Sequence, residues 1–333
     1  SPARIGLPIT ISAALIAAVV WQLPSDFTLD PLTLMWHSGI FPLAFALMVI
    51  DNLIWIWRFK FALSHTPRDK WAGVSKSGVF YSNVLQKLCA RVLPLRLSEP
   101  VWIWSVSRYG ETSPRQAAAS LLAIRSWDVR VLLCSLPLVC WLLDAHWPWL
   151  VVTLMLALAG WLIIAALISG ETRRYIAQKS LGLARTRRLR WLRVSTMRTL
   201  ALWRDVEQQG AYLPLLLSLA SLALSVLIYA VLLHGLGFLV PPAQLVLATL
   251  ALFIASSVPL PALGIFAAGE VGLMFVLVGM NIDPGESAAL VLQLVILDTL
   301  LSVALYLLYL PVHLRVQSLR QIKQLSGGSV NAS

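Results

Sequence analysis

Long apolar stretches, separated by short polar segments, make up most of the chain. A helix needs about 20 apolar residues to cross the hydrocarbon core of a bilayer. Stretches of about that length are predicted to be full spans, and they cover residues 5–23, 42–57, 114–143, 147–168, 212–236 and 287–314. Their apolar residues run without the alternation that membrane strands show, which excludes an outer-membrane barrel. The pattern predicts an all-α polytopic membrane protein with six full spans.

The composition excludes other classes of protein. Of the 333 residues, 59% are hydrophobic and 12% are charged, whereas a soluble domain carries about 25% charged residues. A disordered chain is excluded as well, because disorder requires low hydrophobicity. The net charge of +11 is attributed to cytoplasmic loops and to contacts with anionic lipid headgroups, so no nucleic-acid partner is predicted.

Positive charges gather on alternate loops. The segments after the first predicted span and before the last one carry only acids, among them Asp26, Asp30 and Asp283. Residues 171–209 carry ten Lys or Arg against three Asp or Glu, and further Lys and Arg follow the second and the last spans. Because basic loops remain in the cytoplasm, we predict that both termini lie inside and that 171–209 is a basic cytoplasmic loop. Within it, residues 172–204 are predicted to form amphipathic helix on the anionic inner leaflet.

Two further apolar regions are interrupted in the middle and are predicted to be re-entrant hairpins. With the orientation above, residues 78–109 must enter and leave on the cytoplasmic side, and residues 242–280 on the outer side. Helix breakers divide them, with Pro94 in the first and Pro259 and Pro261 in the second. The hairpins would meet near the midplane, within a single transmembrane domain over 1–333, as in transporters with broken helices. Two kinked helix pairs lying partly in the interface are the alternative.

Ionisable residues inside the predicted spans and hairpins are candidates for a functional site, because each costs about 2.5–3.5 kcal/mol to insert. The set consists of Asp51, Arg96, Glu99, Arg125, Asp128, Arg130, Glu270 and Asp298, joined by Lys87 and Arg91 if the first hairpin enters the membrane.

Each candidate has a functional and a structural interpretation. Arg96 and Glu99 lie at the predicted tip of the first hairpin, where a helix start at Ser98 would receive an anion; alternatively the two charges pair with each other. The three-residue spacing of Arg125 and Asp128 predicts an ion pair on one helix face.

The remaining candidates are three carboxylates whose partners the sequence leaves open. Glu270 opens a predicted half-helix, where it would meet a cation or a proton, or would simply be stabilised by the helix dipole. Asp51 and Asp298 could each pair with one of the arginines, and the sequence does not say which.

Catalytic and metal-binding motifs are missing from the sequence. It contains no HExxH, GxxxxGK[ST], Rossmann glycine pattern or GxSxG. The three cysteines and five histidines have no metal-ligand spacing. We therefore predict no catalytic residue, no cofactor and no metal, and expect that the protein is not an enzyme.

Two motifs taken together carry a family resemblance. The first is the run LPLRLSE at residues 93–99, followed by Arg125 and Asp128 with R-x-x-D spacing. The second is the run VPLPALGIFAAGE at residues 258–270. Together they resemble the flippase-like family typified by the transmembrane region of lysylphosphatidylglycerol synthases. The Trp57-Arg58 pair resembles one that follows the second span in that family.

The sequence also departs from the family pattern. Ser98 replaces a glycine, Ala262-Leu263 replaces a double glycine, Gly269 replaces an arginine, and Asp298 stands where an arginine is frequent. The resemblance implies a stand-alone member without the aminoacyl-transferase domain, in the inner (plasma) membrane of a bacterium.

The resemblance and the charges imply that the protein is a lipid transporter or flippase. It would move an anionic or aminoacylated phospholipid, or a polyprenyl-phosphate-type lipid, through a polar cavity at the midplane. The headgroup would be bound by Arg96, Glu99, Arg125, Asp128, Glu270 and Asp298. The expected partners are membrane lipids, with a homodimer or a lipid-synthesis enzyme left open.

Two alternatives remain at this stage. One is an intramembrane enzyme with Glu99, Asp128 or Glu270 as acid or base. The other is a lipid-binding subunit that recruits a synthase through its basic loop.

Overall fold

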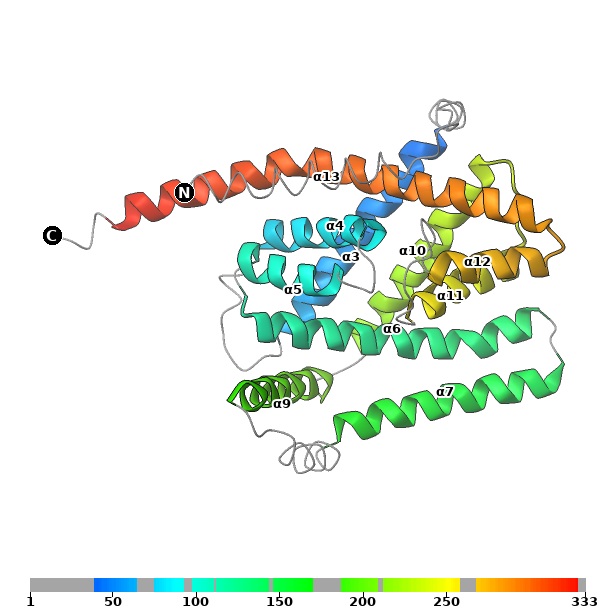
Figure 1. Ribbon diagram of the computed structural model, residues 1–333, viewed down its shortest axis with the longest axis horizontal. Coiled ribbons are helices and arrows are strands. Elements are labelled where there is room, and N and C mark those ends of the chain that lie inside the picture. Colours follow the sequence, from blue (N-terminus) through cyan, green and yellow to red (C-terminus); the bar gives the residue numbers. More distant parts are fainter. Residues whose placement is uncertain are drawn as a thin grey trace.

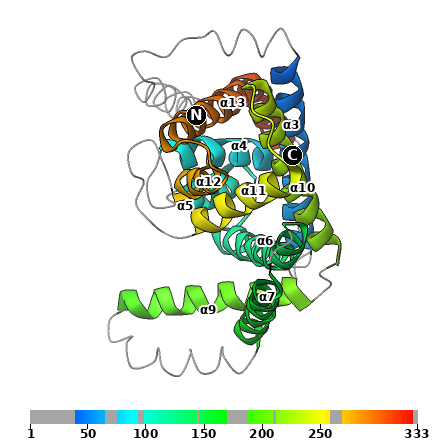
Figure 2. The same ribbon diagram turned by 90° about the vertical axis from the view of Figure 1, so that its right-hand side faces the viewer.

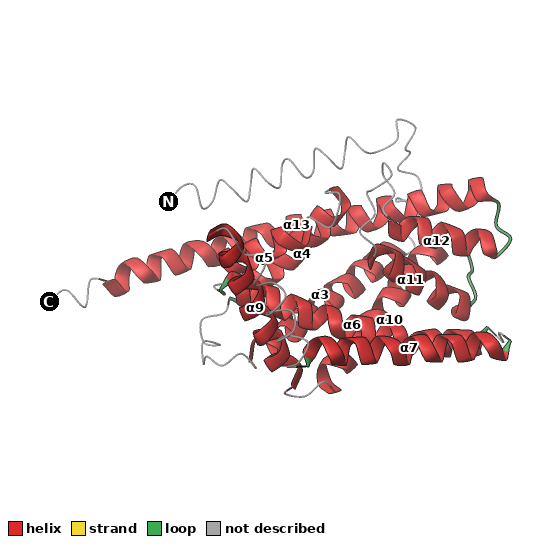
Figure 3. Ribbon diagram, turned by 60° about the horizontal axis from the view of Figure 1, so that its bottom comes forward, coloured by secondary structure: helices red, strands yellow, loops and turns green. Residues whose placement is uncertain are grey.

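The computed structural model of the chain is helical throughout the part that it describes, as Figure 3 shows. It describes residues 39–64, 75–92, 98–110, 112–143, 146–169, 187–208, 212–257 and 268–328. Labelled as in Figure 1, the helices of this part are α3 (Ile40–Ser64), α4 (Lys76–Val92), α5 (Ser98–Tyr109), α6 (Pro114–Leu142), α7 (Trp147–Ile168), α9 (Arg187–Gln208), α10 (Tyr212–Gly235), α11 (Pro242–Ser257), α12 (Ala268–Gly279) and α13 (Pro284–Gly328). The all-α prediction is confirmed for these residues.

Four of the described helices are long and apolar enough to cross a membrane. The segments are Ile40–Leu63 of α3, Trp147–Ala166 of α7, Tyr212–Gly235, which is α10, and Pro284–Val316 of α13. The chain is therefore a multi-pass membrane protein. Helix α6 has the length of a span but carries several charges, so its crossing stays a prediction. The predicted span 5–23 lies outside the described residues.

Both interrupted regions form pairs of short helices. Helix α4 ends at Val92 and α5 begins at Ser98, while α11 ends at Ser257 and α12 begins at Ala268. The helices of each pair pack side by side. In Figures 1 and 3 the two pairs lie towards opposite ends of the long helices α6 and α13. This arrangement agrees with two hairpins that approach each other, and their entry into a membrane remains a prediction.

The two pairs are enclosed by longer helices. Helix α13 contacts α4 and α12, and α6 contacts α5 and α11. Helices α3 and α10 pack against each other and cross beside the pairs, standing upright in Figure 2. Helix α7 packs on α6, and α9 runs across the long helices near one end of α6 (Figures 1 and 2). Within the predicted amphipathic region 172–204 the structure describes α9, which continues to Gln208, and residues 172–186 lie outside the described residues.

An aromatic cluster fixes α3 against α5 and α6. Trp102 of α5 is fully buried and meets Trp55 and Phe59 of α3 edge-on, with ring centroids 4.8 and 5.2 Å apart. Trp127 of α6 is also fully buried and meets Phe61 of α3 edge-on. Edge-to-face pairs add about 0.5–1.5 kcal/mol each to the burial of the rings. The three helices that carry most of the candidate residues are therefore held in one register.

A backbone hydrogen bond joins the start of α4 to the end of α5. The amide of Ser75 donates to the carbonyl oxygen of Gly110 at 3.2 Å. Gly78 makes the approach possible, because a Cβ at this position would lie 1.9 Å from the carbonyl oxygen of Tyr109.

We therefore expect Gly78→Ala to force α4 and α5 apart and to lower the free energy of unfolding by about 2–3 kcal/mol. Thermal unfolding in mild detergent measures the effect. The control is Gly279→Ala, because a Cβ at Gly279 meets nothing within 4 Å. Equal stability of the two variants would contradict the close packing of this helix pair.

Candidate functional site

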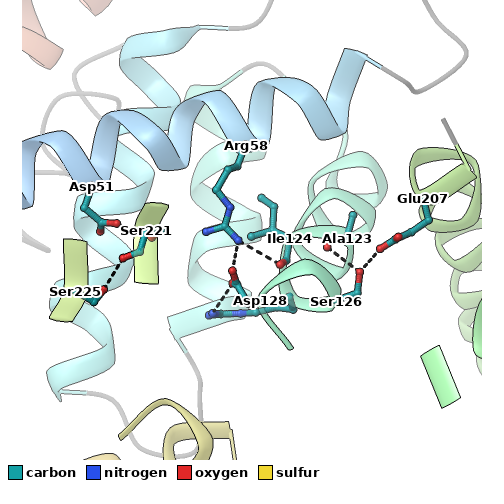
Figure 4. A network of polar contacts seen from close by, with 10 residues as sticks. Asp51, Arg58, Ala123, Ile124, Ser126, Asp128, Glu207, Ser221 and Ser225 are labelled. Carbon is teal, nitrogen blue, oxygen red and sulfur yellow. Dashed lines mark hydrogen bonds and ion pairs between the residues drawn. The ribbon is translucent and has the colours of Figure 1, made fainter. Parts of the chain in front are cut away.

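A chain of alternating charges links α3, α6 and α5. Arg58 of α3 donates to Asp128 of α6 and, at 3.3 Å, to the carbonyl oxygen of Ile124 (Figure 4). Arg125 Nη1 lies 3.9 Å from the other oxygen of Asp128, and Arg125 Nη2 lies 3.3 Å from Oε1 of Glu99 in α5. Two arginines and two carboxylates thus neutralise one another in one place.

Local sequence signals position the members of this network. Helix α6 begins with a capping box, in which Ser113 Oγ accepts from the amide of Gln116 and the Gln116 side chain accepts from the amide of Ser113. Pro114 follows at the first helical position, where its missing N–H has no cost. Helix α5 begins at Ser98 with Glu99 in its first turn, as predicted.

A second polar network lies on the same face of α3. Asp51 precedes Arg58 by two helical turns, and in Figure 4 both side chains extend from the same side of the helix. Lys87 Nζ of α4 lies 2.9 Å from Asp51 Oδ2, and Ser221 Oγ of α10 donates to Asp51 Oδ1 at 2.6 Å. Beside it, Asn83 Nδ2 donates to Asn52 Oδ1 at 2.5 Å.

A third pair attaches α9 to α6. Arg130 Nη1 lies 2.7 Å from Oε2 of Glu207, and Ser126 Oγ donates to the same carboxylate (Figure 4). The Arg130 guanidinium also lies 5.1 Å from the centre of the Trp161 ring of α7. The cation therefore joins three helices.

Exposure separates the charges that can contact a ligand from those that stabilise the packing. The side chains of Arg58 and Glu207 are each 2% exposed. The accessible side chains are Arg125 at 45%, Lys87 at 30%, Asp128 at 26% and Glu99 at 25%. A buried charge is held by its partner, so the accessible group of four is the part of the network that a ligand can reach.

The accessible charges of α4, α5 and α6 lie at similar distances along their helices from the end where Ser75 meets Gly110. The hydrogen bond from Ser75 to Gly110 places the start of α4, the end of α5 and the nearby start of α6 at one end of the molecule. Lys87 and Arg125 lie eleven residues from the first residues of α4 and α6, and Glu99 lies ten residues from the end of α5. At 1.5 Å per residue this is about 15–17 Å along each helix from that end.

Several predicted pairings can be compared with the structure. The ion pair between Arg125 and Asp128 is present. The option of an arginine partner for Asp51 is replaced by Lys87, which is its ion-pair partner. That correction follows from packing, since α4 approaches α3 at this level.

The other candidates lie outside this group or outside the described residues. Arg130 pairs with Glu207 and is buried. Asp298 is half-buried on α13, which packs on α4 and α12, whereas α6 packs on α5 and α11. The proposed Arg96–Glu99 contact involves Arg96, which lies outside the described residues. Glu270 is the third residue of α12, and the surroundings of its side chain are not among the described features.

Sequence reasoning missed Arg58 and Glu207 as members of the networks. Arg58 was considered only as one of the basic residues after the second span and as part of the Trp57-Arg58 pair. The spacing of seven residues from Asp51, which places both on one helix face, was the signal available for it. Glu207 belongs to the predicted basic loop, and no sequence signal connects it with Arg130.

The fold and the site define a class of protein before any comparison: a multi-pass helical membrane protein with a charged network that joins α3, α5 and α6. Residues 8–308 match the family described as the lysylphosphatidylglycerol synthase TM region, and the chain belongs to that family. The resemblance predicted from the two motifs is confirmed. No curated protein and no solved structure gives a significant match. Membership connects the chain with membrane lipids.

Proposed function

We propose that the protein is a lipid transporter of the flippase type, located in the bacterial inner membrane with both termini in the cytoplasm. It moves an anionic or aminoacylated phospholipid, or a polyprenyl-phosphate-type lipid, between leaflets, and it catalyses no chemical step. The observation that carries the proposal is the accessible cation Arg125, which lies between Glu99 and Asp128. Family membership supports a lipid substrate.

The loose pairing of Arg125 suits exchange with a phosphate. Its contacts with Glu99 and Asp128 are 3.3 and 3.9 Å long, longer than the 2.7–2.9 Å of a strong charged hydrogen bond. A planar guanidinium donates to two phosphate oxygens at once. When the phosphate binds, Asp128 keeps its contact with Arg58, and the contact of Arg125 with Glu99 is the one that is exchanged.

Glu99 binds the amino group of an aminoacylated lipid. After Arg125 has moved to the phosphate, the Glu99 carboxylate lies beside the headgroup and accepts hydrogen bonds from the cationic amino group. The acyl tails remain in the surrounding bilayer, so only the polar headgroup needs the charged path.

We expect Arg125→Gln to reduce lipid relocation by at least about tenfold, because a hydrogen bond to a charged group is worth about 1.5–3 kcal/mol. The assay uses proteoliposomes with labelled phosphatidylglycerol and labelled polyprenyl phosphate in separate experiments. Glu99→Gln should impair an aminoacylated lipid more than phosphatidylglycerol, since only the former carries the amino group.

The matched control is Arg198→Gln, which removes an exposed arginine of α9 and should leave the rate unchanged. A wild-type rate in Arg125→Gln would contradict the proposed site. No relocation by the wild-type protein, together with chemically altered lipids in mass spectrometry, would replace the transporter by an intramembrane enzyme.

A further inference from the structure

Lys87 is a second accessible cation at the level of Arg125, on a different helix. Its ammonium group has three N–H donors, and the structure places one of them on Asp51 at 2.9 Å. The lysine side chain is 30% exposed, whereas Asp51 is 11% exposed. The two partners of this ion pair are therefore unequally accessible, and the cation is the one that a ligand reaches.

Asp51 is held independently of Lys87. Its two carboxylate oxygens have separate donors, because Lys87 contacts Oδ2 while Ser221 Oγ donates to Oδ1 at 2.6 Å. Ser221 in turn belongs to a turn of α10 in which its carbonyl oxygen accepts from Ser225 at 2.9 Å. The carboxylate thus stays fixed by α10 when the ammonium moves away on its flexible four-carbon stem.

Positive charge is also present on the same face of α3. Arg58 lies two turns from Asp51 on that face (Figure 4). When an anion binds Lys87, the positive charge of the Arg58 guanidinium still offsets part of the negative charge of Asp51.

The Arg130–Glu207 pair shows what a purely structural ion pair looks like in this protein. Both of its side chains are buried, at 7% and 2% exposure, and neither is reached by a ligand. The Lys87–Asp51 pair differs in the exposure of its cation and in the separate support of its anion.

We propose that Lys87 is a second phosphate-binding residue, which exchanges Asp51 for the phosphate group of a lipid. The proposal rests on the transport function proposed above and adds a second phosphate-binding residue to its site. Asp51 is the resident counter-ion, which keeps the lysine from standing unpaired while no lipid is bound. The ligand chemistry is a phosphate mono- or diester, and its source is a lipid headgroup.

Equilibrium binding of phosphatidylglycerol to the full purified chain in neutral detergent, followed by native mass spectrometry, tests this role. The double variant Lys87→Gln/Asp51→Asn removes both charges and leaves two amides that hydrogen-bond to each other, so folding is preserved. It should bind the lipid at least about tenfold more weakly. Lys87→Arg should bind within about threefold of wild type, because it keeps the cation.

Asp51→Asn alone separates a ligand-binding role from a structural one. If Lys87 binds phosphate, loss of its counter-ion leaves binding unchanged or makes it tighter. If Lys87 serves only to neutralise Asp51, the double variant binds like wild type, and that result would overturn the proposal. Lys76→Gln, which removes an exposed lysine of the same helix, is the control and should bind like wild type.

A parallel titration with inorganic phosphate identifies the source of the anion. Lipid binding that depends on Lys87 and is little affected by millimolar phosphate supports the lipid headgroup. Binding of inorganic phosphate alone would overturn the lipid assignment. The assay requires no transport, so Lys87-dependent lipid binding without relocation would contradict the proposed function while leaving this binding position intact.

Discussion

Glu207→Ala should release α9 from the rest of the molecule and lower the free energy of unfolding by about 3–5 kcal/mol, the usual effect of removing one partner of a buried ion pair. The substitution leaves Arg130 buried without its carboxylate, while Ser126 Oγ keeps the carbonyl oxygen of Ala123 as its acceptor. Trp203 and Val206, which are buried beside this contact on α9, would lose their packing with it. Denaturation in mild detergent measures the change.

Two further variants make the Glu207 result specific. Arg130→Met/Glu207→Leu removes both charges together and should recover most of the stability, because a buried ion pair replaced by apolar residues is often neutral. Asp205→Asn changes a partly exposed acid of the same helix and should alter the free energy of unfolding by less than about 0.5 kcal/mol. A loss of less than about 1 kcal/mol in Glu207→Ala would show that the pair does not hold α9.

Arg58→Met should cost a similar amount, about 3–5 kcal/mol, and should also abolish relocation. Arg58 is 2% exposed and joins α3 to α6 through Asp128 and the Ile124 carbonyl. Without it, Asp128 turns to Arg125, which is then less available for a phosphate. Both contacts are made by Arg58 Nη2, so Arg58→Lys should recover part of the stability, because one ammonium nitrogen can also donate to two acceptors.

The double variant Arg58→Met/Asp128→Leu separates the two effects of Arg58. It should regain stability but not relocation, since the accessible carboxylate is also gone. Lys60→Gln is the matched control on the same helix; Lys60 lies 4.9 Å from the ring of Trp57, which is 60% exposed, a contact worth about 0.5–1 kcal/mol. Recovery of both properties in the double variant would show that this pair is only structural.

Helix positions were largely predictable, because they depend on local signals. The predicted segment 147–168 coincides with α7, and 114–143 differs from α6 by one residue. The breaks in the two interrupted regions were predicted from prolines and from the alternation of charges, and α4, α5, α11 and α12 fall within or close to the predicted limits. Helix α9 ends at Gln208, four residues beyond the predicted limit of 204, while residues 172–186 of that prediction lie outside the described residues.

Charge partners were predictable only within one helix. Arg125 and Asp128 are three residues apart, so helical geometry alone brings them together. Lys87 and Asp51 are 36 residues apart, and Arg130 and Glu207 are 77 apart. Such contacts depend on the rotation and height at which two helices pack, which a single sequence does not specify.

The hydrogen bond between Ser75 and Gly110 and the close contact at Gly78 join α4 and α5 into one unit. This unit carries Lys87 and Glu99, whereas their ion-pair partners Asp51 and Arg125 belong to the neighbouring helices α3 and α6. Under the proposed function, a headgroup bound to both cations would exchange both of these contacts together, while the buried Trp102 cluster keeps α5 packed on α3. Binding would then change the charge contacts of the helix pair without unpacking it.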